Sequence, residues 1–165
     1  MKFEQLNIHP ALLKTLLANQ LTDPTAIQEK CIPPIQQGKD VVGQSGTGSG
    51  KTLAFGLPLL EKIKSGQGVQ ALMLTPTREL GVQVAEVIQT YARPLSLKVA
   101  CVYGGVSLEP QVAAMRRAEI VVSTPGRLLD HINRRNVDFT KIHFLVLDEA
   151  DKMFEMGFQE DVERI

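Results

Sequence analysis

Short apolar runs alternate with helix-like stretches along most of this chain. The runs are rich in β-branched residues and cover residues 40–44, 69–75, 98–103, 119–123 and 142–147. Between two of them, apolar side chains recur at the spacing of one helix face: Leu80, Val84, Val87, Ile88 and Tyr91. Strand, helix and strand in this order make right-handed crossovers between parallel strands, and a parallel sheet is covered on both faces. The sequence therefore predicts a doubly wound α/β fold with three layers.

The chain before the first run consists of helix and turn. Leu12, Leu13, Leu16 and Leu17 form an apolar ridge, and the pair at residues 33–34 is Pro-Pro, which we expect to end the following helix. We therefore divide the chain into an N-terminal helical segment, residues 1–39, and an α/β core, residues 40–165.

Composition narrows the class of protein. The chain has 165 residues, of which 44% are hydrophobic and 22% charged, as expected for one soluble globular domain and not for a disordered or membrane protein. The 18 basic and 18 acidic residues cancel, so local geometry must hold any polyanion. Cys31 and Cys101 form no metal or disulfide pattern, and Lys2 and Phe3 do not begin a secretory signal, so we expect a cytoplasmic protein that does not bind membranes.

A glycine-rich loop follows the first run and precedes a helical stretch. It consists of Ser45, Gly46, Thr47, Gly48, Ser49, Gly50, Lys51 and Thr52. Backbone N–H groups of such a loop converge on phosphates, the lysine reaches the β- and γ-phosphates, and Thr52 can bind Mg²⁺. Ser45 stands where the usual pattern begins with glycine. The alternative is a glycine-rich turn without a ligand, but the strand before and the helix after favour a nucleotide site.

Acidic residues follow the last apolar run, at the start of another helix. Asp148 is placed at the carboxyl end of a buried strand, where a carboxylate can hold Mg²⁺ across the sheet edge, partly through water. Glu149 is the candidate base that orients and deprotonates the attacking water. The alternative is that these residues are acidic only because the helix dipole favours negative charge at the start of a helix. The phosphate loop in the same chain argues against this alternative.

Two further strand-to-helix junctions share one design. Their residues are Thr75, Pro76, Thr77 and Arg78 at one junction, and Thr124, Pro125, Gly126 and Arg127 at the other. Threonine and proline suit the first positions of a helix, and an arginine follows two residues after each proline. Gly104 and Gly105 add a glycine turn after the third run. Parallel strands put these junctions on one edge, which suits a row of backbone phosphates, although Thr-Pro alone is also ordinary helix-start chemistry.

These residues together resemble the first RecA-like domain of the DEAD-box RNA helicases, over residues 3–158. Residues 148–151 read Asp-Glu-Ala-Asp, the tetrad that names the family, and residues 45–52 match its phosphate loop. The resemblance implies ATP and Mg²⁺ as cofactors, with Lys51, Asp148 and Glu149 in catalysis. It also implies RNA-backbone contacts from residues 76–78, 104–105 and 124–127.

The resemblance extends upstream of the phosphate loop. Residues 23–28 resemble the family's adenine-recognition motif, in which Thr25 and Gln28 take part, and Phe3 has the spacing of its isolated aromatic residue. By that resemblance Gln28 hydrogen-bonds the adenine edge and Phe3 stacks on its ring, so ATP is favoured over GTP. Ser45 and Gly81 stand where the family generally has alanine, and both are small-for-small changes.

The resemblance also implies parts that residues 1–165 do not contain. The family's Ser-Ala-Thr strand lies between the phosphate-loop strand and the Asp148 strand, and a second RecA-like domain supplies arginine fingers and half of the RNA groove. We therefore expect a sheet that lacks a central strand, and a truncated domain that is marginally stable and poor at ATP turnover alone. Joined to its second domain, it would act as a monomer that hydrolyses ATP to remodel RNA duplexes or RNA–protein complexes.

Two other functions remain open at this point. A DNA helicase or translocase of the same superfamily would carry a similar phosphate loop, and stimulation of ATP hydrolysis by RNA but not DNA separates the two. A nucleotide-binding module without turnover is the other. Glu149 argues against it for the whole protein, but for residues 1–165 alone it stays open. Glu149→Gln is expected to keep nucleotide binding while abolishing any turnover.

Overall fold

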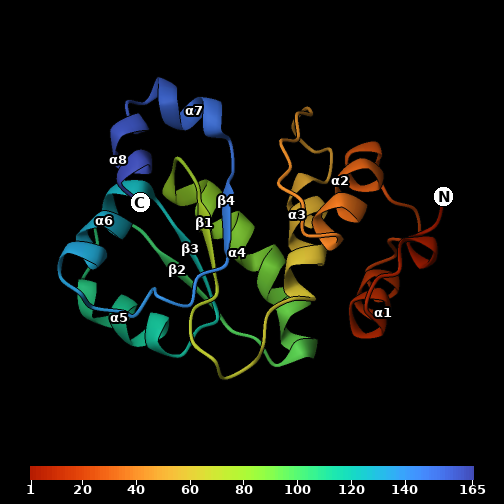
Figure 1. Cartoon of the computed structure of the whole chain (residues 1–165), viewed down its shortest axis with the longest axis horizontal. Coiled ribbons are helices and arrows are strands. Elements are labelled where there is room, and N and C mark those ends of the chain that lie inside the picture. Colours follow the sequence, from red (N-terminus) through yellow and green to blue (C-terminus); the bar gives the residue numbers. More distant parts are fainter.

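A four-stranded parallel sheet forms the centre of the molecule. The computed structural model describes all residues, 1–165, and orders the strands β2-β3-β1-β4 (Figure 1). The strands are β1 Ala71–Leu74, β2 Val99–Val102, β3 Ile120–Ser123 and β4 Phe144–Leu147. All three pairings are parallel, so the predicted doubly wound α/β fold is confirmed.

Helices cover both faces of this sheet. They are η1 Phe3–Leu6, α1 Pro10–Ala18, α2 Ala26–Gln36, α3 Lys51–Leu60, α4 Arg78–Ala92, η2 Arg93–Leu95, α5 Leu108–Arg116, α6 Pro125–Asn133, α7 Ala150–Glu155 and α8 Gln159–Arg164. Helix α4 connects β1 to β2 on one face, whereas α5 and α6 make the return connections on the other. None of these helices is both long and apolar enough to cross a bilayer.

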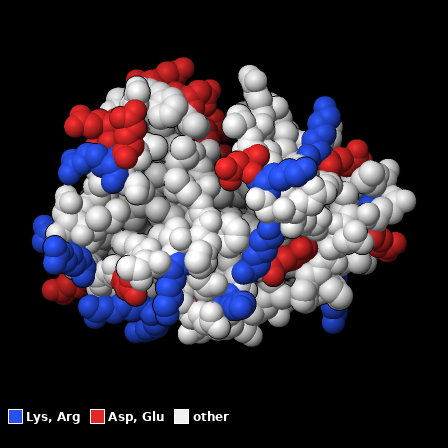
Figure 2. Space-filling model, viewed as in Figure 1, with Lys and Arg blue, Asp and Glu red and all other residues white.

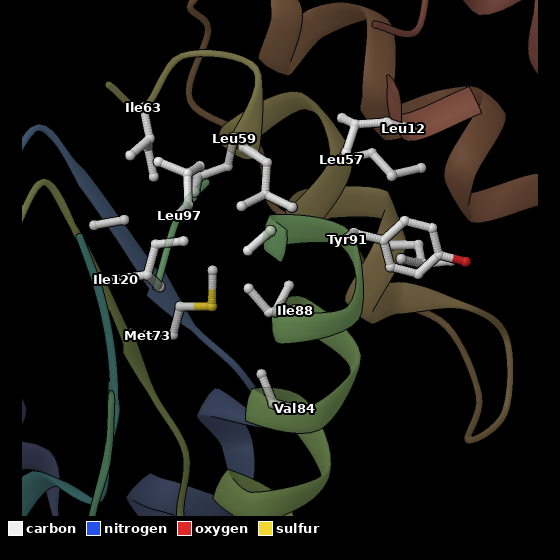
Figure 3. Packing of buried hydrophobic residues seen from close by; sticks show 14 of the residues in the cluster. Leu12, Leu57, Leu59, Ile63, Met73, Val84, Ile88, Tyr91, Leu97 and Ile120 are labelled. Atoms are coloured by element: carbon white, nitrogen blue, oxygen red, sulfur yellow. The ribbon is translucent and has the colours of Figure 1, made fainter. Parts of the chain in front are cut away.

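The core divides into two layers because successive strand residues point to opposite faces. Met73 packs with Ile88 of α4 in the larger cluster, which Figure 3 shows from close by. Its neighbour in sequence, Leu72, packs with Met115 of α5 and Leu128 of α6 in the smaller one. The N-terminal segment joins the larger cluster through Phe3, Leu12, Leu16 and Ile32. The sheet edge that carries the loops is thereby fixed from both faces.

The strand predicted over residues 40–44 is absent, and that prediction was wrong. This segment makes no ladder with β4, the Val42 side chain is fully exposed, and Gly43 lies against Cys31 and Ile27 of α2. A strand exists only where a neighbour takes its backbone hydrogen bonds. β4 is accordingly an edge strand, and its Leu145 side chain is 53% exposed. The sheet therefore ends at β4 on this side, and no strand joins β4 to residues 40–44.

The prediction that Pro33 and Pro34 would end this helix was wrong in position, because α2 continues through both and ends at Gln36. The two prolines stand in the last turn, where only the carbonyls one turn earlier lose a partner. Gln37 and Gly38 then close the helix, the N–H of Gly38 donating to the carbonyl of Ile35 at 2.9 Å. Gly38 takes the left-handed conformation, with φ 80°, that commonly ends a helix.

Candidate nucleotide site and nucleic-acid edge

The carboxyl ends of the strands bring the predicted junctions to one edge of the sheet. In the register, Leu74 of β1 lies beside Ser123 of β3 and Leu147 of β4. The next residues are therefore neighbours: the N–H of Asp148 donates to the Leu74 carbonyl at 2.9 Å, and that of Thr75 to the Ser123 carbonyl at 2.9 Å. Loops that are far apart in sequence thus follow one edge of the sheet, which lies toward the top of Figure 1.

The glycine-rich loop leads directly into α3, as predicted. Gly48 and Gly50 have φ 75° and 83°, values that favour glycine, and Lys51 is the first residue of the helix. The hydroxyls of Ser45 and Ser49 lie 2.6 Å apart, and the Lys51 ammonium donates to the Ser45 carbonyl at 3.1 Å. The loop is therefore closed on itself, with its lysine folded back over it.

The Lys51 ammonium also reaches the acidic residues after β4. Its Nζ lies 3.4 Å from Oε1 of Glu149, and the two side chains are 27% and 25% exposed. Burial raises the pKa of the neighbouring Asp148 carboxyl, the adjacent Glu149 raises it further, and Lys51 lowers it. Glu149 itself has φ 54°, an uncommon conformation for a residue with a side chain, at the start of α7. The structure thus brings together the three predicted catalytic residues.

The donor set at this point suits Mg²⁺. Asp148 and Glu149 crowd two carboxylates into a half-buried place, where a nearby cation would offset their repulsion. The Thr52 hydroxyl stands in the first turn of α3, which begins at the loop. No three His, Cys, Asp or Glu side chains gather as a metal site, and Mg²⁺ held by one carboxylate, nucleotide phosphates and water does not require such a group.

The predicted adenine motif is bound to the phosphate loop. Gln28 accepts a hydrogen bond from the Thr25 N–H at 2.9 Å and donates to the Gly50 carbonyl at 3.0 Å. A Cβ on Gly50 would collide with the Gln28 amide. No motif in the sequence indicates this link, which connects α2 to the last glycine of the loop.

Phe3 has a different environment from the one predicted. Its side chain is 1% exposed and belongs to the larger core cluster, so its ring presents no open face at the loop. Stacking on adenine would require the ring to be uncovered. The role of Phe3 at the nucleotide stays a prediction.

The junction after β1 is built as predicted, and it contacts the loop after β2. The Thr77 hydroxyl accepts from the Leu80 N–H at 3.2 Å and so caps α4, and Pro76 is buried. Arg78 is exposed, with its guanidinium carbon 4.5 Å from the ring centroid of Tyr103. One predicted arginine therefore rests on the strand end that precedes the glycine turn.

The junction after β3 contacts the same loop from the other side. Pro125 is the first residue of α6, after Thr124, and Gly126 is exposed. Nη1 of Arg127 donates to the Val106 carbonyl at 2.9 Å. Gly104 and Gly105, between the two arginine contacts, are exposed, and a Cβ on either would meet nothing within 4 Å. The predicted RNA-contacting residues thus lie along one edge, with open backbone at the glycine turn.

Charge is unevenly spread around this edge. In Figure 2 several acidic side chains gather at the upper left, where Figure 1 places α7 and α8, and several lysines and arginines gather at the lower left, while side chains of both signs lie on the right. On the face shown, the end of this edge beside α7 and α8 therefore carries no dense positive patch. A phosphate chain bound there depends on individually placed donors.

Comparisons with known proteins agree with this geometry. The family model described as "DEAD/DEAH box helicase" matches residues 25–165. An "ATP-dependent RNA helicase DeaD" of Mycobacterium tuberculosis is 51% identical over 99% of this chain, which spans 30% of that protein.

Solved structures give the same result. A DEAD box protein from Methanococcus jannaschii superposes with a TM-score of 0.96 at 44% identity over 99% of this chain and 46% of its own. The RNA helicase Prp28 from Chaetomium thermophilum, bound to ADP, has a TM-score of 0.90 at 41% identity over 99% of this chain and 42% of its own. The chain thus spans less than half the length of each of these relatives.

Proposed function

The chain belongs to the DEAD/DEAH box helicase family, and from this membership we propose that it is the ATP- and RNA-binding first RecA-like domain of an ATP-dependent RNA helicase. In the whole protein, ATP hydrolysis would remodel RNA duplexes or RNA–protein complexes as a second RecA-like domain closes on this one. We further propose Mg²⁺ as the metal, a monomeric state and a cytoplasmic location.

One observation carries the proposal. The Lys51 ammonium of the phosphate loop meets the Glu149 carboxylate at 3.4 Å, although 98 residues separate them, on the sheet edge that also presents Arg78 and Arg127. A phosphate-binding lysine, a paired acid and two arginine-bearing loops on one edge suit an ATPase that acts beside a polyanion.

These residues divide the chemistry between them. The loop N–H groups and Lys51 would bind the β- and γ-phosphates, with the lysine exchanging its contact with Glu149 for a phosphate oxygen. Thr52 and Asp148 would hold Mg²⁺, which neutralises phosphate charge when bound. Glu149, released from Lys51, would orient a water and accept its proton as the water oxygen bonds to the γ-phosphorus and the bond to the β–γ bridging oxygen breaks.

The other half of the edge would bind RNA through its backbone. Arg78, Arg127 and the exposed glycine turn offer donors to phosphates and none selected for base edges, so we expect binding without sequence preference. With two arginines at the phosphates, the logarithm of affinity should fall with the logarithm of salt with a slope of about −1.4 for a single strand.

The test measures three quantities on the chain: affinity for a fluorescent ATP analogue with Mg²⁺, affinity for single-stranded RNA and DNA of one sequence, and ATP turnover with and without the second domain added. We expect Mg-ATP binding, preference for RNA, and RNA-stimulated turnover that Glu149→Gln abolishes while nucleotide binding remains. Equal stimulation by DNA would instead support a DNA translocase. Binding without turnover in the presence of the second domain would support a binding module.

A further inference from the structure

A buried polar network lies beneath the loop after β2. Gln111 of α5 is its centre: Nε2 donates to the Tyr103 carbonyl at 2.9 Å, and Oε1 accepts from Nη1 of Arg127 at 3.3 Å. The same oxygen lies 3.0 Å from Nε2 of His131, whose side chain is 0% exposed, and Nδ1 of that ring lies 3.1 Å from the Asn136 amide. No motif in the sequence marks this cluster, because 20 residues separate Gln111 from His131.

The geometry assigns the hydrogen atoms. Because the Gln111 amide nitrogen donates to the Tyr103 carbonyl, its oxygen faces both Arg127 and His131. Nε2 of His131 must then carry the hydrogen, and Nδ1 of the neutral ring accepts from Asn136. Burial, with help from Arg127, lowers the pKa of His131, which agrees with a neutral ring. No buried side-chain donor or acceptor in the molecule lacks a partner, so the network is complete.

The network connects the two arginines of the edge. Arg127 is held by Gln111 and, through the same nitrogen, by the Val106 carbonyl. Arg78 rests on the ring of Tyr103, whose carbonyl Gln111 holds. The segment between these two contacts includes Gly105 at φ 81° and is exposed to solvent, so it has little packing of its own. One buried amide therefore connects two helix starts and the glycine turn.

We propose that Gln111, supported by His131, is a positioning residue of the nucleic-acid edge. It fixes the Arg127 guanidinium and the residue 103–106 loop relative to each other, so that both arginines meet the phosphates of one strand without first being ordered. This inference rests on the proposed RNA binding. Positioning by Gln111 matters most on an edge with few positive charges, where preorganised donors bind phosphates without a strong positive field.

Gln111→Met removes all three hydrogen bonds while keeping a side chain of similar length. We expect its RNA affinity to fall about tenfold, which corresponds to the loss of one or two hydrogen bonds between the arginines and RNA phosphates. The affinity for Mg-ATP should stay unchanged. Gln67→Met is the matched control, because Gln67 is exposed in the turn before β1, at the amino end of the strands. It should bind RNA as the wild type does.

A second readout does not depend on RNA. In the wild-type chain the Arg127 guanidinium should give separate nitrogen-bound proton signals by NMR, identified by their loss in Arg127→Lys, because its rotation is restricted. In folded Gln111→Met these signals should merge. If they remain separate and RNA affinity is unchanged, the proposal is overturned. If the wild-type chain does not bind RNA, the proposed function fails, and the Arg127 signals alone decide the positioning role.

Gln111→Glu covers the case in which Gln111→Met does not fold. A carboxylate still accepts from Arg127 and His131, but it cannot donate to the Tyr103 carbonyl. We expect the Arg127 signals to stay separate and RNA affinity to fall by less than with methionine. Wild-type affinity in this variant would show that the Tyr103 bond positions nothing, and would overturn the proposal.

Discussion

The two halves of the carboxyl edge are held in different ways. The loops after β1, β2 and β3 follow paired strands, and their arginines are fixed on one another through Tyr103 and Gln111. The phosphate loop follows a segment without a strand partner, and side-chain bonds hold it: Gln28 to Gly50, and Lys51 to Glu149. The predicted RNA half is thus preformed, whereas the nucleotide half is closed by a bond that a bound phosphate would replace.

The same contrast appears in the two sides of β1. Toward β3 and β2, the strand residues are mostly buried, and Ile120, Val121 and Val122 have no exposed surface. Toward β4, Leu145 and Leu147 are exposed although they belong to a strand of the sheet. An apolar edge strand with free backbone groups is a site of self-association as well as of weak local stability.

The largest effect we predict compares the two sides directly. Leu128→Ala empties a fully buried position under the paired strands and should lower the free energy of unfolding by about 2–5 kcal/mol. Leu145→Ala makes the same change on the open edge and should cost less than about 1 kcal/mol, since little surface is removed from water. Urea unfolding followed by circular dichroism measures both. Equal losses in the two variants would mean that the β4 edge is covered in solution.

The next largest effect concerns the bond that closes the nucleotide half. Lys51→Ala removes the ammonium that would reach the phosphates, and Mg-ATP affinity should fall about 10- to 100-fold, as expected for hydrogen bonds to charged groups. Affinity for RNA without nucleotide should not change. Lys14→Ala, at an exposed lysine of α1, is the control for the loss of one positive charge. Retention of wild-type nucleotide affinity in Lys51→Ala would exclude the proposed role of the loop.

A smaller effect distinguishes the two glycine turns. Gly50→Ala places a Cβ at φ 83° and against the Gln28 amide, so it should destabilise the fold by roughly 1–2 kcal/mol and weaken Mg-ATP binding. Gly104→Ala adds a Cβ that meets nothing within 4 Å and should leave the melting temperature unchanged. Thermal melting and nucleotide titration of both variants give the comparison. A stable Gly50→Ala with normal binding would show that the loop adjusts without its contact to α2.

Much of this contrast could not be predicted from the sequence. The runs that became β1, β2, β3 and β4 were recognisable because each contains a continuous apolar stretch, which is typical of strands in a parallel sheet. Residues 40–44 contain only two adjacent valines, between Asp40 and Gly43, and whether such a segment forms a strand depends on a partner that its composition does not show. In the same way, Phe3 has the spacing of a stacking residue, yet core packing covers its ring.

The candidate site also contains parts that could be predicted from the sequence and parts that could not. The loop at residues 45–52 and the acids at 148–149 were predictable because each is contiguous and stands at a strand-to-helix junction. The links from Gln28 to Gly50 and from Gln111 to Arg127 join residues 22 and 16 positions apart on separate elements. Glutamine is common on helices, so only its burial marks these two, and burial depends on the folded neighbours.

The smallest predicted effect tests whether the preformed half depends on a neutral ring. Since burial lowers the pKa of His131 in the folded chain, the unfolded chain takes up this proton first as the pH falls below about 6.5. The free energy of unfolding should therefore decrease as the pH falls from 7.5 to 5.5, because the contribution from His131 is fully present above the pKa of the unfolded chain and is progressively lost below it. Asp130, Arg127 and Arg134 are the charged groups that act on this ring.

His131→Asn removes this contribution, so its stability should change less over the same pH interval in urea unfolding. His143→Asn, the same change at an exposed ring, should keep the wild-type dependence. RNA affinity gives the sharper comparison, because a charged His131 can no longer accept from Asn136 and the network under Arg127 must rearrange. Affinity for RNA should then weaken with falling pH in the wild type more than in His131→Asn. An identical pH dependence of RNA affinity in both proteins would show that His131 does not help to position the loops after β1, β2 and β3.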